Sequence, residues 1–241
     1  MVDINKLRQE QIKYAKKVVI KDEFDKIETI AGCDQAFIGN KVVSEIVVLN
    51  AKTLEVLEKK YAITDVKVPY IPTFIFFREG PAILEAYNKL DIKPDVLMMD
   101  SFGILHPQRI GMASHIGIIL DIPTIGVSRS LICGTVKGED VYIDKELMGK
   151  KLLTKEFANP LYISPGHKIT LKTAVELVKS TTKEPHKLPE PLHIAHRMVK
   201  KVVHRLQEKQ AGRVPIEQQK EIKDFDDEVI DIKDIDSEKE D

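Results

Sequence analysis

Residues 27–63 read IETIAGCDQAFIGNKVVSEIVVLNAKTLEVLEKKYAI and contain three runs typical of β-strands. The runs cover residues 27–37, 42–50 and 54–63, and they are rich in Val, Ile and Leu. Short separators around Gly39 and Lys52 lie between them. Because connections this short join antiparallel neighbours, the stretch predicts a three-stranded antiparallel meander.

After this meander the pattern changes to alternating strands and helices. The run DVLMMD at 95–100 is continuously apolar, as expected of a buried parallel strand. The elements expected after it are a helix at about 108–120, strands at 123–127 and 160–164, a helix capped by Thr170 and ending near Ser180, and a last helix from Glu190 to about Gln207. A right-handed crossover would place the fourth strand beside the first. The sequence therefore predicts an α/β fold with a mixed β-sheet flanked by helices on both faces, in the element order of a ribonuclease H-like fold.

Three further local predictions follow from the pattern. Residues 3–20 predict an amphipathic helix whose apolar side is formed by Leu7, Ile12, Ala15, Val18 and Val19. Pro81 is expected to open a helix that ends near Leu90, because proline is tolerated in the first helical turn. The segment SPGH at 164–167 is expected to form a structural turn.

The charge is unevenly distributed along the 241 residues. Residues 221–241 hold 11 acidic and three basic residues, a net charge of −8, whereas the whole chain carries −1 and the other 220 residues therefore carry +7. We expect a single domain at 1–212 and an acidic tail at 213–241, disordered because it has few apolar residues. A basic body is compatible with a polyanion partner, although charge alone favours an ordinary soluble domain.

Neither a membrane segment nor a secretory signal is recognisable. No apolar run approaches the length that a bilayer requires, and the N-terminus is charged. The two cysteines, Cys33 and Cys133, form no metal-binding or disulfide pattern. We therefore expect a cytoplasmic protein that does not contact a membrane.

Two of three candidate acidic residues lie on strands that are expected to be neighbours. Asp34 lies within the first strand, Asp100 ends the fourth, and Glu79 lies just before the helix predicted to begin at Pro81. Each acid alone is typical of a turn or cap. Carboxylates buried together are costly unless a cation compensates their charge, and Mg²⁺ prefers oxygen ligands. The two aspartates on neighbouring strands therefore favour a metal site about as strongly as separate structural roles, and Glu79 could supply a third carboxylate.

The last helix carries two histidine-containing stripes. His196 lies on its apolar side, where a lone histidine is most often a packed core residue. His193, Arg197, Lys200 and His204 form a second stripe. That stripe would suit phosphate contacts, but a solvated helix face is the more common explanation.

Five segments of the chain resemble the endonuclease V family, the deoxyinosine-directed repair nucleases. The segments are AGCDQAF (31–37), VPYIPTFIFFREGP (68–81), DSFGILHPQRIGMASHIGIILDIPTIGVSRSL (100–131), NPLYISPGH (159–167) and KLPEPLHIAH (187–196). They occur in the family's order and cover most of residues 25–200. The combination of PYIP, FREGP, HPQR, ASH and IPTIGV is highly specific.

The resemblance implies a ribonuclease H-like nuclease that requires Mg²⁺, with Mn²⁺ as a substitute. Such enzymes cut the second phosphodiester bond on the 3′ side of inosine and leave 3′-hydroxyl and 5′-phosphate ends. Asp34, Glu79 and Asp100 match the family's metal-binding carboxylates, and His196 matches the histidine that completes the active site. For His196 the resemblance replaces the core interpretation.

The resemblance also implies residues that contact the nucleic acid. Tyr70 matches the aromatic wedge of the PYIP loop, which can replace the stacking lost when a damaged base is flipped out. The other matched substrate residues are Pro69, Ile71, Pro72 and Thr73 in the loop, Ser101, His106 and Gly111 at the base pocket, and Arg129, which stands where the family has a lysine near the phosphate backbone.

Two departures from the family pattern fall in the base pocket. Many relatives have Asp-Gly-His-Gly where this chain has Asp-Ser-Phe-Gly at 100–103, and glycine where it has Thr73. Because those glycines allow close approach to the flipped base, Ser101, Phe102 and Thr73 leave the base preference open. The metal-binding carboxylates are retained.

Three functions remain open at this point. The leading hypothesis is a monomeric DNA-repair endonuclease acting at deoxyinosine. The second is an endoribonuclease acting at inosine in RNA with the same active site, since recognition of the 2′-hydroxyl would decide between the two. The third is a non-catalytic module that binds deaminated nucleic acid.

Overall fold

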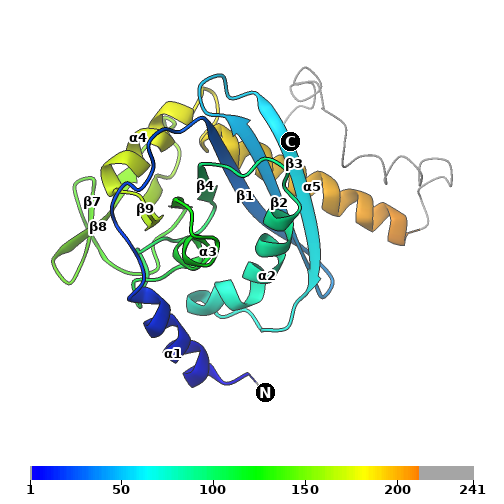
Figure 1. Ribbon diagram of the computed structural model, residues 1–241, viewed down its shortest axis with the longest axis horizontal. Helices are drawn as coiled ribbons and strands as arrows, with labels where there is room; N and C mark the ends of the chain where they lie inside the picture. The colour runs from blue at the N-terminus through cyan, green and yellow to red at the C-terminus, as the bar shows by residue number, and fades with distance from the viewer. Residues whose placement is uncertain (1, 212–241) are drawn as a thin grey trace.

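Residues 2–211 are described by the computed structural model of the chain (Figure 1). The acidic tail expected at 213–241 lies outside these residues. Nine strands form one mixed sheet in the order β3-β2-β1-β4-β5-β9-β8-β7-β6. Their bounds are β1 Thr29–Ile38, β2 Lys41–Asn50, β3 Val56–Asp65, β4 Val96–Met99, β5 Thr124–Ser128, β6 Thr135–Lys137, β7 Asp140–Ile143, β8 Glu146–Leu152 and β9 Leu161–His167.

The predicted meander and crossover are both confirmed. β1 pairs antiparallel with β2, and β2 pairs antiparallel with β3. β4 then pairs in parallel with the other edge of β1 and places Met99 opposite Cys33. Since Asp34 and Asp100 each follow one member of that pair, the register brings the two aspartates to the same end of neighbouring strands.

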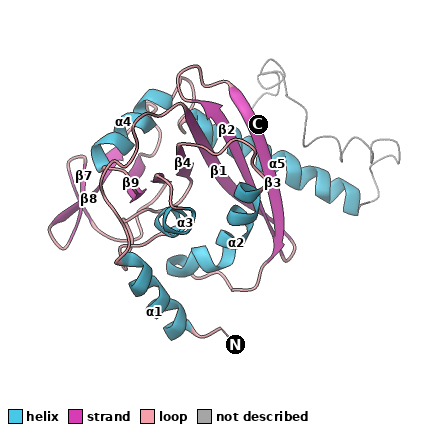
Figure 2. Ribbon diagram, viewed as in Figure 1, coloured by secondary structure: helices cyan, strands magenta, loops and turns pink. Residues whose placement is uncertain are grey.

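Helices cover both faces of the sheet, as expected (Figure 2). Helices α2 (Ile75–Asn88) and α3 (Met112–Leu120) pack on one face with Ala31, Cys33 and Met99. Helices α4 (Leu171–Thr181) and α5 (Glu190–Gln210) pack on the other face with Ile30 and Met98. This alternation along β1 and β4 follows from the two-residue period of a strand. The Thr170 cap is confirmed, because its side chain accepts a hydrogen bond from the Thr173 amide.

The first helix differs from its prediction. Helix α1 covers only Ile4–Ala15, and its capping residue Asp3 accepts hydrogen bonds from two amides of the first turn. Its buried side chain is Gln11, which is 1% exposed, whereas Ile12 is 38% exposed. Leu7 and Ala15 lie on the same side as Gln11 and are half-buried, as predicted, whereas Ile12 was wrongly expected to face inward because the inward position is the polar Gln11.

Two helix starts were also predicted wrongly. Helix α2 begins at Ile75, after a 3₁₀ turn at Pro72–Phe74, so Pro81 lies inside it and Glu79 lies in its middle rather than before it. Because proline has no N–H group, Pro81 cannot donate the helical hydrogen bond to the carbonyl of residue 77. Helix α3 begins only at Met112 because Arg109 has a φ of 57°, outside the helical range.

The segment 164–167 is not a turn but the end of strand β9, which pairs antiparallel with β5. An irregularity in the register near Gly166 accommodates the Pro-Gly pair, which is where a strand tolerates these residues. Strands β6, β7 and β8 were not anticipated, because few of their residues are buried: none in β6, one in β7 and two of seven in β8. No helix within residues 2–211 has the length and apolar character needed to cross a membrane.

Candidate functional site

The centre of the candidate site is the contact between β1 and α5. Gly32 lies two residues before Asp34 on the same face of β1, and any Cβ atom there would overlap the Pro191 carbonyl at the start of α5. The missing side chain therefore lets α5 lie directly against the strand. One turn further along α5, His196 Nδ1 lies 2.6 Å from Asp34 Oδ2.

Asp100 lies beside this pair at the end of β4. Its amide donates to the Cys33 carbonyl at 3.4 Å, which continues the β1–β4 pairing for one residue. Its side chain forms a 2.6 Å ion pair between Oδ2 and Nη2 of Arg129, which follows β5. Burial raises the pKa of Asp100, the Arg129 guanidinium opposes this rise, and the charge of Asp34 adds to it.

Glu79 enters the site from α2, on a third element. Burial raises the pKa of Glu79 to about 7, Arg78 opposes the rise, and the charge of Asp34 adds to it. The acid is 9% exposed. Asp34 thus raises the pKa of both other carboxyls, so the three acids form one electrostatic group in which each added negative charge is unfavourable.

An open cleft of about 390 Å³ contains these groups. Asp34, Glu79, Asp100, Ser101, Arg129 and His196 all line it. Among residues 2–211, no three His, Cys, Asp or Glu side chains are arranged so that they could hold a metal ion. Asp34 contacts His196, and Asp100 forms an ion pair with Arg129. The donor set nevertheless fits a hard divalent cation. It offers carboxylate oxygens, and a bound cation would offset the electrostatic repulsion between these carboxylates.

The loop at 68–73 borders the site and is held at both ends. Arg78 Nη1 donates to the Val68 carbonyl at 3.2 Å. At the other end the Thr73 carbonyl accepts from Gln11 Nε2 at 2.5 Å and lies 3.1 Å from His106 Nε2. Between these anchors Tyr70 is 64% exposed. The loop therefore presents an aromatic ring to solvent on a backbone that is fixed at each end.

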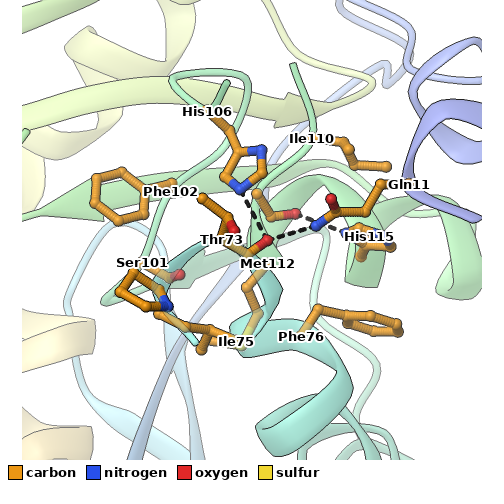
Figure 3. Close-up of a pocket in the computed structure, with 12 residues that line it drawn as sticks. Gln11, Thr73, Ile75, Phe76, Ser101, Phe102, His106, Ile110, Met112 and His115 are labelled. Atoms are coloured by element: carbon orange, nitrogen blue, oxygen red, sulfur yellow. Dashed lines mark hydrogen bonds between the residues drawn. The ribbon is translucent and has the colours of Figure 1, made fainter. Parts of the chain in front are cut away.

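A second, much smaller cavity lies behind this loop (Figure 3). Pro72, Thr73, Ser101, His106 and Gly111 line it, and its volume is about 10 Å³. Burial lowers the pKa of His106 to about 4, so its ring is neutral at pH 7. Its Nε2 then donates to Thr73, and its Nδ1 accepts from the Gln108 amide at 3.2 Å. Ile75, Ser101, Phe102 and Met112 line both cavities, so the acidic cleft and the pocket are adjacent.

The residues expected at the site therefore fall into three groups. The four expected catalytic residues share the cleft with Arg129, and five expected substrate residues share the small cavity. Pro69, Tyr70 and Ile71 line neither. Gln11 and His115 line the small cavity but were missed by sequence reasoning. The signal for Gln11 was a polar residue on the inward side of α1, and His115 stood unremarked in the ASH motif.

Comparison with known proteins identifies the family. The profile described as endonuclease V matches residues 12–197. The endonuclease V of Dictyoglomus thermophilum is 41% identical over 201 residues, which cover 80% of this chain and 88% of that protein. The endonuclease V of Rippkaea orientalis is 40% identical over 202 residues, which cover 79% of this chain and 86% of that protein.

Solved structures agree with this result. The Bacillus subtilis endonuclease V superposes with a TM-score of 0.80 at 29% identity, covering 87% of this chain and 95% of that one. The Ciona intestinalis endonuclease V, solved in complex with a 24mer DNA containing an inosine followed by a ribo-adenosine, gives a TM-score of 0.77 at 26% identity, covering 84% of this chain and 98% of that one. The expected ribonuclease H-like fold is confirmed. The chain belongs to the endonuclease V family and is an endonuclease that acts on phosphodiester bonds.

Proposed function

We propose that this protein is a magnesium-dependent endonuclease that nicks DNA at the second phosphodiester bond on the 3′ side of deoxyinosine. The products would carry 3′-hydroxyl and 5′-phosphate ends, and the reaction would serve DNA repair. The observation that carries this proposal is that Asp34, Glu79, Asp100 and His196 line one cleft. The inosine-containing DNA bound by the Ciona relative supports the choice of lesion.

Asp34, Glu79 and Asp100 would hold the metal, which when bound supplies Lewis-acid stabilisation of charge on the phosphate oxygens. Residues of the chain position the phosphate and the attacking water. The contact with Asp34 orients the His196 ring and leaves Nε2 to meet a water or a phosphate oxygen. Arg129 is the cation at the rim of the cleft, and its guanidinium can transfer from Asp100 to a phosphate with bidentate geometry.

The loop and the small cavity would select the base. Tyr70 is placed to stack in the gap that a flipped base leaves in the strand. The pocket of Thr73, Ser101, His106 and Gly111 would receive the base, and it must widen to do so because about 10 Å³ holds little more than one water. We expect a monomer that works in the cytoplasm.

One observation favours RNA as a second candidate substrate. In the Ciona complex the inosine is followed by a ribo-adenosine. A 2′-hydroxyl next to the cut position is the group that separates RNA from DNA. The sequence similarity to proteins named endonuclease V argues against the third hypothesis, a non-catalytic binding module.

The test is a nicking assay with end-labelled deoxyinosine DNA and the matched inosine RNA, each with Mg²⁺, Mn²⁺ or EDTA. The proposal expects a cut in the DNA one nucleotide beyond the lesion, with Mg²⁺ and not with EDTA. If only the RNA is cleaved, the substrate is inosine RNA rather than deoxyinosine DNA, and the proposed metal-dependent hydrolysis is retained. Cleavage in EDTA would reject the metal dependence.

A further inference from the structure

Two buried polar atoms at the small cavity have no hydrogen-bond partner among residues 2–211. They are Gln11 Oε1, on α1, and His115 Nε2, on α3. Gln11 is 1% exposed and His115 is fully buried. Both side chains line the same cavity of about 10 Å³ (Figure 3). A buried polar atom without a partner is costly, so this pair calls for a common explanation.

Hydrogen bonding fixes both atoms as acceptors. Gln11 Nε2 must donate to the Thr73 carbonyl, which leaves Oε1 as the carbonyl end of the amide. His115 Nδ1 lies 3.1 Å from the Gly111 carbonyl and must donate to it. Burial lowers the pKa of His115 to about 4, so the ring is neutral and Nε2 carries a lone pair. Two acceptors cannot satisfy each other, whereas a small molecule with two donors can satisfy both.

Water has that chemistry and that size. It offers two O–H donors, and a cavity of about 10 Å³ is close to the smallest that holds one. The surroundings also keep the ring of His115 in place, because it stacks on Phe76 with centroids 4.2 Å apart and planes at 7°. The acceptor Nε2 is therefore held in one position at the cavity.

We propose that Gln11 is a positioning residue for the loop at 68–73, and that one buried water donates to Gln11 Oε1 and His115 Nε2 to complete its contacts. Gln11 is one of two side chains at the Thr73 carbonyl, the other being His106 from the pocket. Helix α1 thus fixes the end of the loop that carries Tyr70, although it contributes no residue to the acidic cleft. The selectivity for deoxyinosine, which rests on the proposed function, then depends on a residue outside the reacting groups.

The test compares Gln11→Met with Gln9→Met. Methionine at position 11 keeps the length of the side chain and removes both its donor and its acceptor. Gln9 is exposed on the same helix, so it receives the same substitution without touching the cavity.

Hydrogen exchange of the peptide covering residues 68–77 is the first readout, and it needs no DNA. We expect faster exchange in Gln11→Met, with Gln9→Met matching the wild type. The second readout is the ratio of dissociation constants for deoxyinosine and unmodified duplexes. Gln11→Met should lower this selectivity by about tenfold, the effect of one buried hydrogen bond, without changing the affinity for unmodified DNA. A merely structural role would weaken both affinities together.

A high-resolution crystal structure of the wild type tests the water directly and does not depend on any variant folding. The proposal expects one ordered water within hydrogen-bond distance of both acceptors, and a dry cavity would overturn that part. Unchanged exchange at 68–77 in Gln11→Met would overturn the positioning role. If the wild-type protein binds deoxyinosine and unmodified duplexes equally well, the proposed function is rejected. The positioning role is still tested in that case, because hydrogen exchange is measured without DNA.

Discussion

At the scale of single residues, the site depends on carboxyls whose charges oppose one another. Asp34 raises the pKa of both Glu79 and Asp100, and burial is the larger cause in each case. The folded protein therefore holds protons at this site more tightly than the unfolded chain does. That arrangement destabilises the fold at neutral pH, and it favours a cation when one is available.

Glu79 gives a prediction for stability without metal. Its carboxyl has a pKa of about 7 in the fold against 4.5 ordinarily, so it is protonated in both states below pH 4.5 and charged in both above pH 7. The free energy of unfolding should fall as pH rises across that window, by up to about 3 kcal/mol from this group. Urea unfolding in EDTA should show a shallower pH dependence for Glu79→Gln. Glu85→Gln, on the exposed side of the same helix, should keep the wild-type slope; equal slopes in all three would contradict the account.

Tyr70 gives a prediction for binding. An exposed ring that stacks on bases contributes roughly 1–3 kcal/mol. Tyr70→Ala should therefore weaken binding of deoxyinosine duplexes by about tenfold or more, whereas Tyr70→Phe, which keeps the ring, should bind nearly as the wild type. Fluorescence anisotropy with a labelled duplex measures both variants. An unchanged affinity in Tyr70→Ala would show that the ring does not stack.

Some site residues could be predicted from the sequence and others could not, for physical reasons. Asp34 and Asp100 follow from topology, because neighbouring parallel strands bring their carboxyl ends together. Glu79 was placed outside its helix, because Pro81 gave a false helix start. Gln11 was missed, because its burial depends on a carbonyl 62 residues away that no local pattern reveals.

At the scale of elements, the N-terminal segment is attached to the rest of the domain by side-chain caps. The Asp22 carboxylate accepts from the Thr170 amide at 2.7 Å, and from the hydroxyls of Thr170 and Thr173 at 3.1 and 2.7 Å. It therefore supports the first turn of α4 from outside the helix. Nearby, the Val19 amide donates to His167 Nδ1 at the end of β9.

Removal of the Asp22 carboxylate should destabilise the fold. Asp22→Ala removes the acceptor of the Thr170 amide and of the Thr173 hydroxyl at the start of α4, which we expect to lower the free energy of unfolding by about 2 kcal/mol. Asp25→Ala changes an exposed acid three residues away and should have little effect. Urea denaturation of both variants is the measurement. Equal midpoints would show that the cap does not contribute.

The success of prediction at this scale depended on length and periodicity. The meander, β4 and α5 are long or strongly apolar, and their places were correct. Strands β6 to β8 have few buried positions, and they are stabilised by pairing rather than by their own pattern, since β6 pairs with β7, β7 with β8 and β8 with β9. Helix α3 started late because the left-handed Arg109 overrides the apolar period.

At the scale of the whole molecule, the charge asymmetry has a consequence for DNA binding. The last 21 residues carry a net charge of −8 against +7 for the rest of the chain. We expect the tail to repel DNA weakly, through long-range charge that salt screens. Deletion of residues 213–241 should tighten binding to unmodified duplexes at low ionic strength, and the difference should vanish as salt rises. Identical salt titrations with and without the tail would reject the idea.

The central claim is that Asp34, Glu79 and Asp100 form the metal-dependent nicking centre. The most direct measurement compares Asp34→Asn with the wild type and with the exposed-acid control Asp25→Asn, on one labelled deoxyinosine duplex in Mg²⁺, with affinity measured on the same duplex. The account predicts that Asp34→Asn loses about 10³-fold or more of the nicking rate and still binds the duplex, while the control retains both. Nicking by Asp34→Asn at the wild-type rate would contradict the claim.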